Sequence, residues 1–210
     1  MNRLLPLFPL QLVVFPGSAV PLHIFEERYK EMVGEAEARS SEFGIVLVKD
    51  GGIANAGCTV VVEKVLRRYP DGRFDLVARG QRRFEIVALD QEKDYLRGEV
   101  EFFADEEDAA PVDAGLRQRA IEGLEKIQRA LEETSGAPPD PENPFLGFEL
   151  AQRVEDLDFQ NMVQRSRSEA ERLRMFADFA EKYIERRKYA EKMKRSAPQN
   201  GSGHMRVGSS

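Results

Sequence analysis

Residues 4–33 decide the fold of this chain, and they read LLPLFPLQLVVFPGSAVPLHIFEERYKEMV. Short apolar runs are broken by prolines at positions 6, 9, 16 and 21, and the last run leads into a stretch with helical spacing. Proline cannot donate a hydrogen bond to a β-ladder, so it is confined to strand ends, edges and bulges. A chain with prolines at this density bends repeatedly. We therefore expect the corners of a small β-barrel here.

Composition sets the broad class of the protein. The 210 residues are 41% hydrophobic and 32% charged, which supports a buried core beneath a well-solvated surface. The formal charge of −6 argues against nucleic acid as a partner, because nucleic-acid-binding domains are usually basic. Cys58 is the only cysteine, which excludes an internal disulfide and a cysteine-based zinc site. A single cysteine also fits a reducing compartment.

The sequence shows no targeting or membrane segment. The apolar start is short and interrupted by prolines, unlike the core of a signal peptide. No run approaches the ~20 apolar residues that a membrane-spanning helix needs. We therefore expect a cytoplasmic protein without membrane contact.

The first half of the chain is predicted to be strands with one helix. Apolar side chains at helical spacing predict an amphipathic helix over 25–38. Its inward face would hold Phe25, Tyr29, Met32, Val33 and Ala36. Apolar runs and alternation predict strands at 43–48, 58–69, 74–78, 84–88 and 95–103. Pro70-Asp71-Gly72 has the residues of a hairpin turn, and Gly80 suggests a turn or bulge.

The second half is predicted to be helical. One apolar stripe predicts a helix over 112–133, and a proline-rich loop follows at 135–144. Two short helices are expected at 145–154 and 159–165, the second capped by Asp158. Ser168-Glu169-Ala170-Glu171 is a capping-box sequence that would open a long final helix. Its inward face would hold Leu173, Phe176, Ala180, Tyr183 and Ile184.

The composition changes after Asp105-Glu106-Glu107-Asp108, which we interpret as a solvated linker. These carboxylates lack the spacing and the glycine of a calcium-binding loop, so we expect no metal there. The predicted class is α+β, with a β-rich module over 1–107 and a helical bundle over 112–195. The Gly-, Ser- and Asn-rich residues 196–210 are expected to be a disordered tail.

Several catalytic motifs are missing from these 210 residues. There is no phosphate loop of the G-x-x-x-x-G-K-[ST] type, no H-E-x-x-H and no G-x-S-x-G. His23 is the one histidine outside the expected tail. No nucleophile or carboxylate pattern accompanies it, so we expect it to pack at the strand–helix corner and to hydrogen-bond the backbone. The sequence therefore predicts no catalytic residue, no metal and no cofactor.

Basic residues gather on neighbouring predicted strands. They are Arg67, Arg68, Arg79, Arg82 and Arg83. Arg67, Arg79, Arg82 and Arg83 could contact an anion or an RNA backbone. The alternative is a solvated face on which Glu63, Asp75 and Glu85 balance the arginines, and we favour it because few aromatic residues are interleaved with them.

Several of these segments together resemble a known family. They are LPLFP (5–9), VFPG (14–17), PLHIFEERY (21–29), FGI (43–45), GCTV (57–60), PDGR (70–73), GQRRF (80–84) and YLRGEVE (95–101). The sequence closely resembles the Lon protease N-terminal domain family, the substrate-binding domain of ATP-dependent protease La, and in particular its stand-alone bacterial members. The resemblance implies a PUA-like pseudo-β-barrel followed by a helical bundle. In full-length Lon proteases this region helps to recognise unfolded or tagged substrates.

Three functions follow as hypotheses. The leading one is a non-enzymatic module that binds unfolded or hydrophobic protein segments, or a protein partner, in a groove between barrel and bundle. The side chains expected to serve it are Phe8, Phe15, His23, Phe25 and Tyr29. The second is RNA binding by analogy with PUA-like folds, for which fold alone is weak support. The third, which we favour least, is an ATP-independent peptidase that depends on His23.

Overall fold

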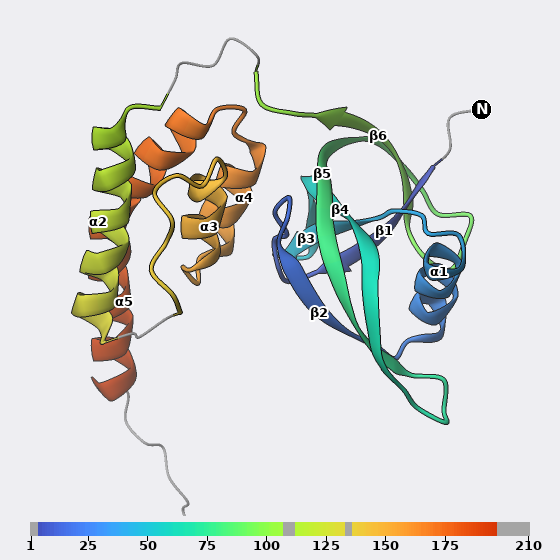
Figure 1. Cartoon of the computed structure of the whole chain (residues 1–210). Coiled ribbons are helices and arrows are strands. Elements are labelled where there is room, and N and C mark those ends of the chain that lie inside the picture. The colour runs from blue at the N-terminus through green and yellow to red at the C-terminus, as the bar shows by residue number, and fades with distance from the viewer. Residues whose placement is uncertain (1–3, 107–111, 133–135, 197–210) are drawn as a thin grey trace, which may run out of the picture.

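The computed structural model describes residues 4–106, 112–132 and 136–196. The strands are β1 (Leu5–Leu10), β2 (Ala19–Ile24), β3 (Phe43–Lys49), β4 (Gly52–Arg68), β5 (Phe74–Asp90) and β6 (Arg97–Phe103). The helices are α1 (Glu27–Ala38), α2 (Ala114–Leu131), α3 (Leu146–Gln152), α4 (Leu157–Arg165) and α5 (Glu169–Ser196). In Figure 1 the strands lie between α1 on one side and the other four helices on the opposite side. Within the described residues, no helix combines the length and the apolar character needed to cross a bilayer.

The sheet closes on itself and forms the predicted pseudo-barrel. The strand order is β2-β5-β4-β3-β1-β6, and β6 also pairs with β5, so that β2 is attached outside a closed ring along β5. β1 runs parallel to β3, whereas the other pairs are antiparallel. β4 and β5 are each 17 residues long, and β5 joins two segments that were predicted as separate strands. The Asp71-Gly72 turn connects β4 to β5 as predicted, with Gly72 at a φ of +82°.

Gly80 lies at a β-bulge, which confirms that prediction. The register of β4 with β5 shifts between the pairs Cys58–Arg83 and Val60–Gly80. The loop that follows β1 packs directly against this point: a Cβ atom on Gly80 would lie 2.1 Å from the carbonyl oxygen of Phe15. The backbone carbonyl of Gly80 also accepts a hydrogen bond from Gly17 N–H at 2.9 Å. Only glycine allows the loop to approach the strand this closely.

The predicted helix at 25–38 is α1, and four of its five expected inward residues are buried. Phe25 is the exception, since 58% of its surface is exposed. The expectation that Phe25 points inward was wrong because α1 begins only at Glu27. β2 alternates between exposed and buried side chains up to Ile24, and Phe25 continues that alternation on the exposed face.

The helical half follows the prediction, with two corrections at helix starts. Asp156, and not Asp158, caps α4 by accepting a hydrogen bond from Phe159 N–H at 2.9 Å. Only half of the capping box of α5 forms. Ser168 Oγ accepts from Glu171 N–H at 3.4 Å, but the Glu171 carboxylate accepts from the Ser166 hydroxyl.

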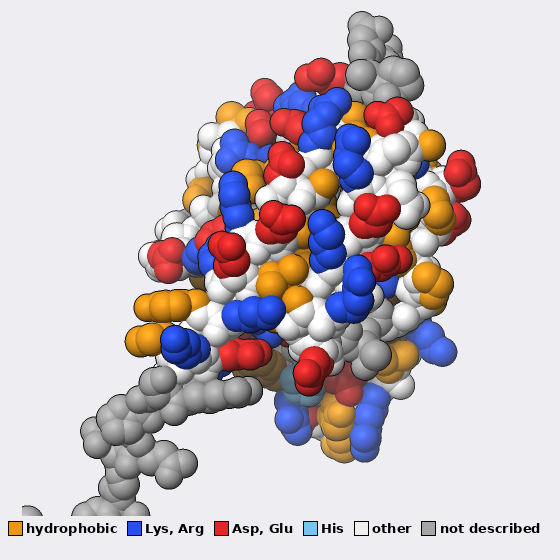
Figure 2. Space-filling model, turned by 90° about the vertical axis from the view of Figure 1, so that its left-hand side faces the viewer, with side chains coloured by type: hydrophobic (Ala, Val, Ile, Leu, Met, Phe, Trp, Pro, Cys, Tyr) orange, Lys and Arg blue, Asp and Glu red, His pale blue; other side chains and the backbone are white. Residues whose placement is uncertain are grey.

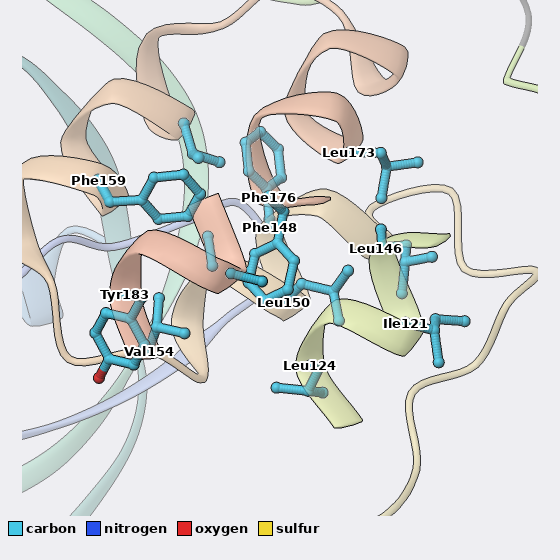
Figure 3. Packing of buried hydrophobic residues seen from close by; sticks show 14 of the residues in the cluster. Ile121, Leu124, Leu146, Phe148, Leu150, Val154, Phe159, Leu173, Phe176 and Tyr183 are labelled. Carbon is cyan, nitrogen blue, oxygen red and sulfur yellow. The ribbon is translucent and has the colours of Figure 1, made fainter. Parts of the chain in front are cut away.

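One hydrophobic core spans both halves of the chain. Side chains of all four bundle helices pack together in it, and Figure 3 shows members of this cluster, including Val154 between α3 and α4. Val13, Phe15 and Leu47 of the β-rich half belong to the same cluster, and the ring of Phe15 stacks on Phe148 at 5.1 Å. A second core fills the barrel beneath α1. Of the expected tail, Ser196 is the last residue of α5 and the rest lies outside the described residues.

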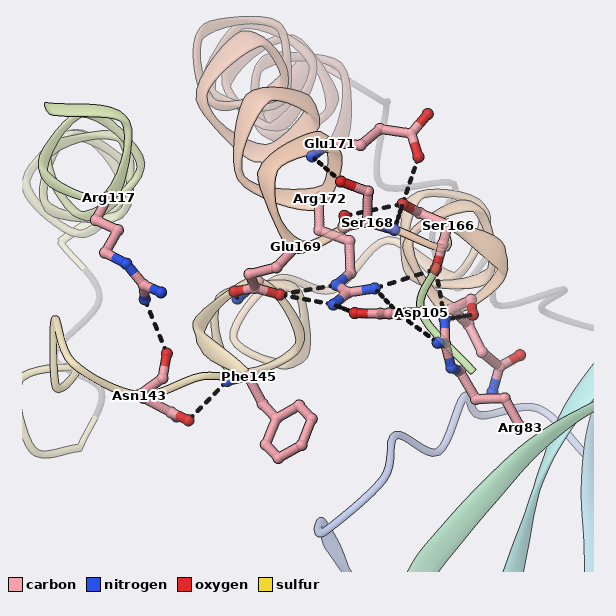
Figure 4. Close-up of polar contacts among 12 residues, drawn as sticks. Arg83, Asp105, Arg117, Asn143, Phe145, Ser166, Ser168, Glu169, Glu171 and Arg172 are labelled. Atoms are coloured by element: carbon pink, nitrogen blue, oxygen red, sulfur yellow. Dashed lines mark hydrogen bonds and ion pairs between the residues drawn. The ribbon is translucent and has the colours of Figure 1, made fainter. Parts of the chain in front are cut away.

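A buried ion network joins the two halves (Figure 4). The carboxylate of Asp105, just after β6, accepts from Arg83 of β5 and from Arg172 of α5. Arg172 is fully buried and also pairs with Glu169 at 2.9 Å. Arg83 is 4% exposed and donates to the backbone carbonyls of Gln164 and Ser166. The interpretation of 105–108 as a solvated linker was therefore wrong for Asp105, while residues 107 and 108 lie outside the described part.

Candidate binding hollow at the strand–helix corner

A hollow of about 410 Å³ lies where β1, β2 and α1 meet. It is lined by Phe8, Pro9, Leu10, His23, Ile24, Phe25, Glu26, Arg28 and Tyr29. Four of the five side chains expected to bind a polypeptide therefore come together. All of them belong to the β-rich half, so this hollow is not the expected groove between barrel and bundle.

The hollow has an apolar floor and a partly exposed rim. Phe8 and Tyr29 are 6% and 7% exposed, and their ring centroids lie 4.2 Å apart. Burial raises the pKa of the Tyr29 hydroxyl, against the influence of the Arg28 cation. His23 and Phe25 stand on the exposed face of the β2 segment, with their rings stacked at 5.8 Å. The burial pattern of β2 explains this division, because every second side chain faces the barrel core.

His23 is held by a carboxylate and not by the backbone, which corrects the sequence-based expectation. β2 and β5 pair so that His23 lies opposite Asp75, and His23 Nδ1 donates to Asp75 Oδ1 at 2.5 Å. The hydroxyl of Tyr69 donates to the other carboxylate oxygen at 2.8 Å. These two hydrogen bonds, first that of His23 and then that of Tyr69, lower the pKa of the Asp75 carboxyl. The hydrogen bond between Tyr69 and Asp75 also raises the pKa of the Tyr69 hydroxyl.

This cluster orients an imidazole but does not place a nucleophile beside it. In the described part of the chain, the hydrogen bonds of His23 and Asp75 lead to Tyr69 and to no serine, threonine or cysteine. Cys58 lies in the barrel core, where burial raises its thiol pKa to about 12. A histidine–carboxylate pair without a nucleophile lacks the arrangement of a covalent hydrolase. The geometry therefore holds an imidazole in a fixed orientation with no nucleophile beside it among the described residues.

Phe15 lies apart from the other four candidates. It is 1% exposed and packs in the core that the two halves share. Together with Phe145 and Phe148 it lines a smaller hollow of about 320 Å³ at the junction with α3. Phe145 is 50% exposed there and is the side chain that sequence analysis missed. Phe145 begins a predicted short helix, and its local sequence gives no signal that it will contact the loop after β1, which is distant in the sequence.

The four candidate arginines do not form one cationic surface. Arg79 binds Glu63 through two hydrogen bonds of 2.9 and 2.8 Å, and this contact lowers the pKa of the Glu63 carboxyl. Arg82 binds Glu42 at 2.8 Å, and Arg67 stacks over the ring of Tyr69. Arg83 is buried in the ion network described above, so its guanidinium cannot meet an external anion. Carboxylates balance the positive charge of these arginines. Glu63 does so as expected by binding Arg79, whereas Asp75 binds His23.

Among the described residues, no group of three or more His, Cys, Asp and Glu side chains is arranged to hold a metal ion. The carboxylates near the hollow are instead hydrogen-bonded by other side chains. Asp75 binds His23 and Tyr69, and Glu26 binds Arg28 at 2.7 Å. These contacts give the rim a set of fixed polar groups around an apolar floor.

Comparison with known proteins gives a consistent result. Residues 4–192 match the ATP-dependent protease La (LON) substrate-binding domain family. The chain is 25% identical over 197 residues, 86% of its length, to a Lon protease of Roseiflexus castenholzii. It is 29% identical over 109 residues, 48% of its length, to a Lon protease of Parabacteroides distasonis. These matches cover only 24% and 13% of the two relatives, so the chain spans a small part of their length.

Two solved structures have the same fold. A Lon N-terminal domain protein from Xanthomonas campestris is 25% identical and aligns with a TM-score of 0.65, covering 84% of this chain and 98% of that chain. The N-terminal domain of a Lon protease from the Mycobacterium avium complex aligns with a TM-score of 0.64 at 20% identity, covering 85% and 98% of the two chains. At 20% identity, the similarity to the second structure shows a shared fold alone.

Proposed function

Because the chain belongs to the ATP-dependent protease La (LON) substrate-binding domain family, we propose that it binds unfolded or hydrophobic protein segments without acting on them chemically. The binding site in this proposal is the hollow at the strand–helix corner. The bound segment would place an apolar side chain against Phe8 and Tyr29, beneath the ring of Phe25. The cytoplasm is the compartment we propose, since the one cysteine is a buried free thiol.

The exposure of Phe25 is the observation that carries this proposal. Phe25 is 58% exposed beside an apolar hollow, so part of its hydrophobic surface is in contact with water. A bound segment would cover this surface and exclude the water, which is favourable. The stacked ring of His23 fixes one side of Phe25, and Asp75 fixes His23. Aromatic side chains, phenylalanine among them, are enriched in protein interfaces, where binding buries them.

Polar groups at the rim would orient the bound segment by hydrogen bonding to its backbone. His23, Glu26 and Arg28 are among the residues that line the hollow. Their N–H groups and carboxylate oxygens can bind the backbone of an extended segment, which needs both donors and acceptors. The absence of a nucleophile beside His23 in the described residues supports a binding role over peptidase activity.

Fluorescence anisotropy of a dye-labelled, permanently unfolded polypeptide tests the proposal. Phe25→Ala should weaken binding by roughly fivefold or more, as loss of about 1 kcal/mol at an interface residue does. Phe145→Ala is the matched control, because Phe145 is similarly exposed but lines the junction hollow. A weaker complex only with Phe145→Ala would move the site to the junction. Equal affinity for folded and unfolded polypeptides would contradict the proposal.

A further inference from the structure

Two Asp-Gly pairs occur in the sequence, and the structure places both at exposed hairpin turns. Asp50-Gly51 connects β3 to β4, and Asp71-Gly72 lies in the turn from β4 to β5. In an Asp-Gly pair, the glycine nitrogen can attack the aspartate side chain, because glycine has no Cβ atom to obstruct the approach. How fast each pair reacts in the folded protein depends on what holds its carboxyl group and its backbone nitrogen.

The Asp50-Gly51 turn is held by few contacts. Its φ angles of +50° and +78° are typical of a type I′ turn of two residues, and the pairing of Lys49 with Gly52 closes it. Within residues 4–106, 112–132 and 136–196, no hydrogen bond reaches the Asp50 carboxylate or leaves Gly51 N–H. A Cβ atom on Gly51 would meet nothing within 4 Å. The carboxyl group and the nitrogen can therefore approach each other without breaking a hydrogen bond.

The Asp71-Gly72 turn is instead held at each group that would have to move. The Asp71 carboxylate accepts from Arg73 N–H at 3.2 Å and from Arg73 Nε at 2.7 Å. Gly72 N–H donates to the Tyr69 carbonyl at 3.0 Å. The ammonium of Lys30, from α1, donates to the Asp71 carbonyl at 3.1 Å. Attack of the Gly72 nitrogen on the Asp71 side chain would break several of these bonds at once.

The same contacts keep the Asp71 carboxyl ionised. The hydrogen bond from the backbone N–H of Arg73, followed by that from its side chain, lowers the pKa of this carboxyl. Figure 2 shows Lys and Arg side chains at the lower end of the molecule, where Figure 1 places the tip of the β4–β5 hairpin. Ring closure expels the hydroxyl of a protonated carboxyl as water, so a carboxyl that stays ionised reacts more slowly. Both the position and the charge of Asp71 thus oppose the reaction.

We propose that Asp50-Gly51 is a site at which the folded protein converts aspartate to isoaspartate, and that the fold protects Asp71-Gly72 from this change. The Gly51 nitrogen forms a bond to the Asp50 carboxyl carbon, and the carboxyl hydroxyl leaves as water with the proton of the nitrogen. The resulting succinimide ring takes up one water. When it opens at the main-chain carbonyl, the backbone runs through the side chain of residue 50 and its main-chain carboxylate is free. Water is the only co-reactant.

The change at Asp50 would reach the helical half through Lys49. Lys49 precedes the turn, and its ammonium binds the carboxylate of Asp158 in α4. An isoaspartyl linkage lengthens the backbone of a turn whose residue number is set by the pairing of Lys49 with Gly52. It also places a new carboxylate next to Lys49, where it competes with Asp158. Conversion therefore loosens a contact between the barrel and α4.

Incubation of the folded full chain at neutral pH, followed by denaturation and digestion with endoproteinase Asp-N, tests the proposal. This protease cuts before aspartate but not before isoaspartate. Cleavage before Asp50 should decline on the order of tenfold faster than cleavage before Asp71, because reaction at Asp71 must break hydrogen bonds. Peptide mapping separates both sites from Asn200-Gly201, which lies outside the described residues. Undiminished cleavage before Asp50, or equal decline at the two sites, would overturn the proposal.

Two controls show whether the fold causes the difference. In urea both turns lose their structure, so the two pairs should convert at similar rates. A preference for Asp50 that persists in urea would come from the neighbouring sequence and would overturn the proposed protection. Arg73→Ala removes the side-chain hydrogen bond to Asp71 and should speed conversion there severalfold in the folded protein, with the rate at Asp50 unchanged. An unchanged rate at Asp71 in this variant would also contradict the protection.

Discussion

The carboxylate of Asp105 binds the guanidinium of Arg172 at 2.8 Å and so ties the end of the barrel to the final helix. Sixty-seven residues separate the two in the sequence. The buried Arg83 uses the same carboxylate, and both guanidinium groups lie against the ring of Phe148, Arg172 at 4.1 Å and Arg83 at 5.2 Å. Asp105 thus binds cations from both halves of the molecule, and Glu169 is a second carboxylate partner of Arg172.

Replacing Asp105 by Asn should destabilise the protein. Removing one partner of a buried ion pair typically costs about 3–5 kcal/mol, because the other charge is left without compensation. The side chain of Asp105 is 35% exposed, so water partly replaces it, and we expect about 2–3 kcal/mol. Urea unfolding followed by circular dichroism measures the change. Glu106→Gln, at the exposed neighbouring position, is the control and should alter the free energy of unfolding little.

The effect of Asp105→Asn should depend on pH. Burial opposes ionisation of Asp105, but the hydrogen bonds and charges of Arg172 and Arg83 outweigh it and hold the pKa of that carboxyl below its usual range. A carboxyl with a lowered pKa stabilises the fold above its unfolded pKa of about 3.9 and loses this contribution as the pH falls further. The difference in unfolding free energy between wild type and variant should therefore shrink below about pH 4. A difference that grows on acidification would contradict the assignment.

Two glycine substitutions should have opposite effects. Gly80→Ala places a methyl group 2.1 Å from the carbonyl oxygen of Phe15 and forces the loop off the strand, at a cost of roughly 1–3 kcal/mol. Gly34→Ala, in α1, meets nothing within 4 Å and should stabilise the helix by up to about 1 kcal/mol. Thermal or urea unfolding of both variants checks the pair. Equal effects would mean that the contact at Gly80 is not rigid.

Removing the neighbours of Asp75 should raise its pKa in a defined order. The hydrogen bond from His23 lowers the pKa of the Asp75 carboxyl most, and the bond from Tyr69 comes second. His23→Ala should therefore raise this pKa more than Tyr69→Phe does. Carboxyl carbon NMR titrations of the two variants measure it. The reverse order would show that the tyrosine is the main partner.

The thiol of Cys58 should be unreactive in the folded protein. Burial raises its pKa to about 12, whereas a cysteine in an unfolded chain has a pKa of about 8.5. A thiol reagent such as DTNB should react fully in denaturant but only at the rate of unfolding under native conditions. Rapid labelling of the native protein would place Cys58 outside the core.

Local sequence signals predicted most of the secondary structure, because each depends on neighbours within a few residues. The hairpin turn shows this: Tyr69 N–H donates to the Arg73 carbonyl at 2.8 Å, as the proline, aspartate and glycine between them favour. The apolar stripe of α2 likewise places Leu116, Leu124 and Ile127 in the core. The family resemblance, and with it the barrel, also came from short contiguous motifs.

Partners distant in sequence could not be predicted in this way. His23 and Asp75 lie 52 residues apart, and only the register of β2 against β5 brings them together. Asp105 looked like the start of an acidic linker because Arg83 and Arg172 lie 22 and 67 residues away. The exposure of Phe25 depended on where β2 ends and α1 begins. Because α1 starts at Glu27 and not at residue 25, Phe25 follows the alternation of β2 and not the spacing of the helix.

The hydrogen bond from Gln164 Nε2 to the backbone carbonyl of Val14, at 2.7 Å, has a consequence for how the protein is made. It connects residues 150 positions apart, so the ribosome must release α4 before the loop after β1 can be secured. Until then Phe15 and Arg83 lack the bundle atoms they contact in the finished structure. Domains generally fold as units while the chain is being synthesised, at roughly 5–20 residues per second. In this protein the barrel emerges first but completes its packing only after α3 and α4 have been synthesised, on the order of several seconds later.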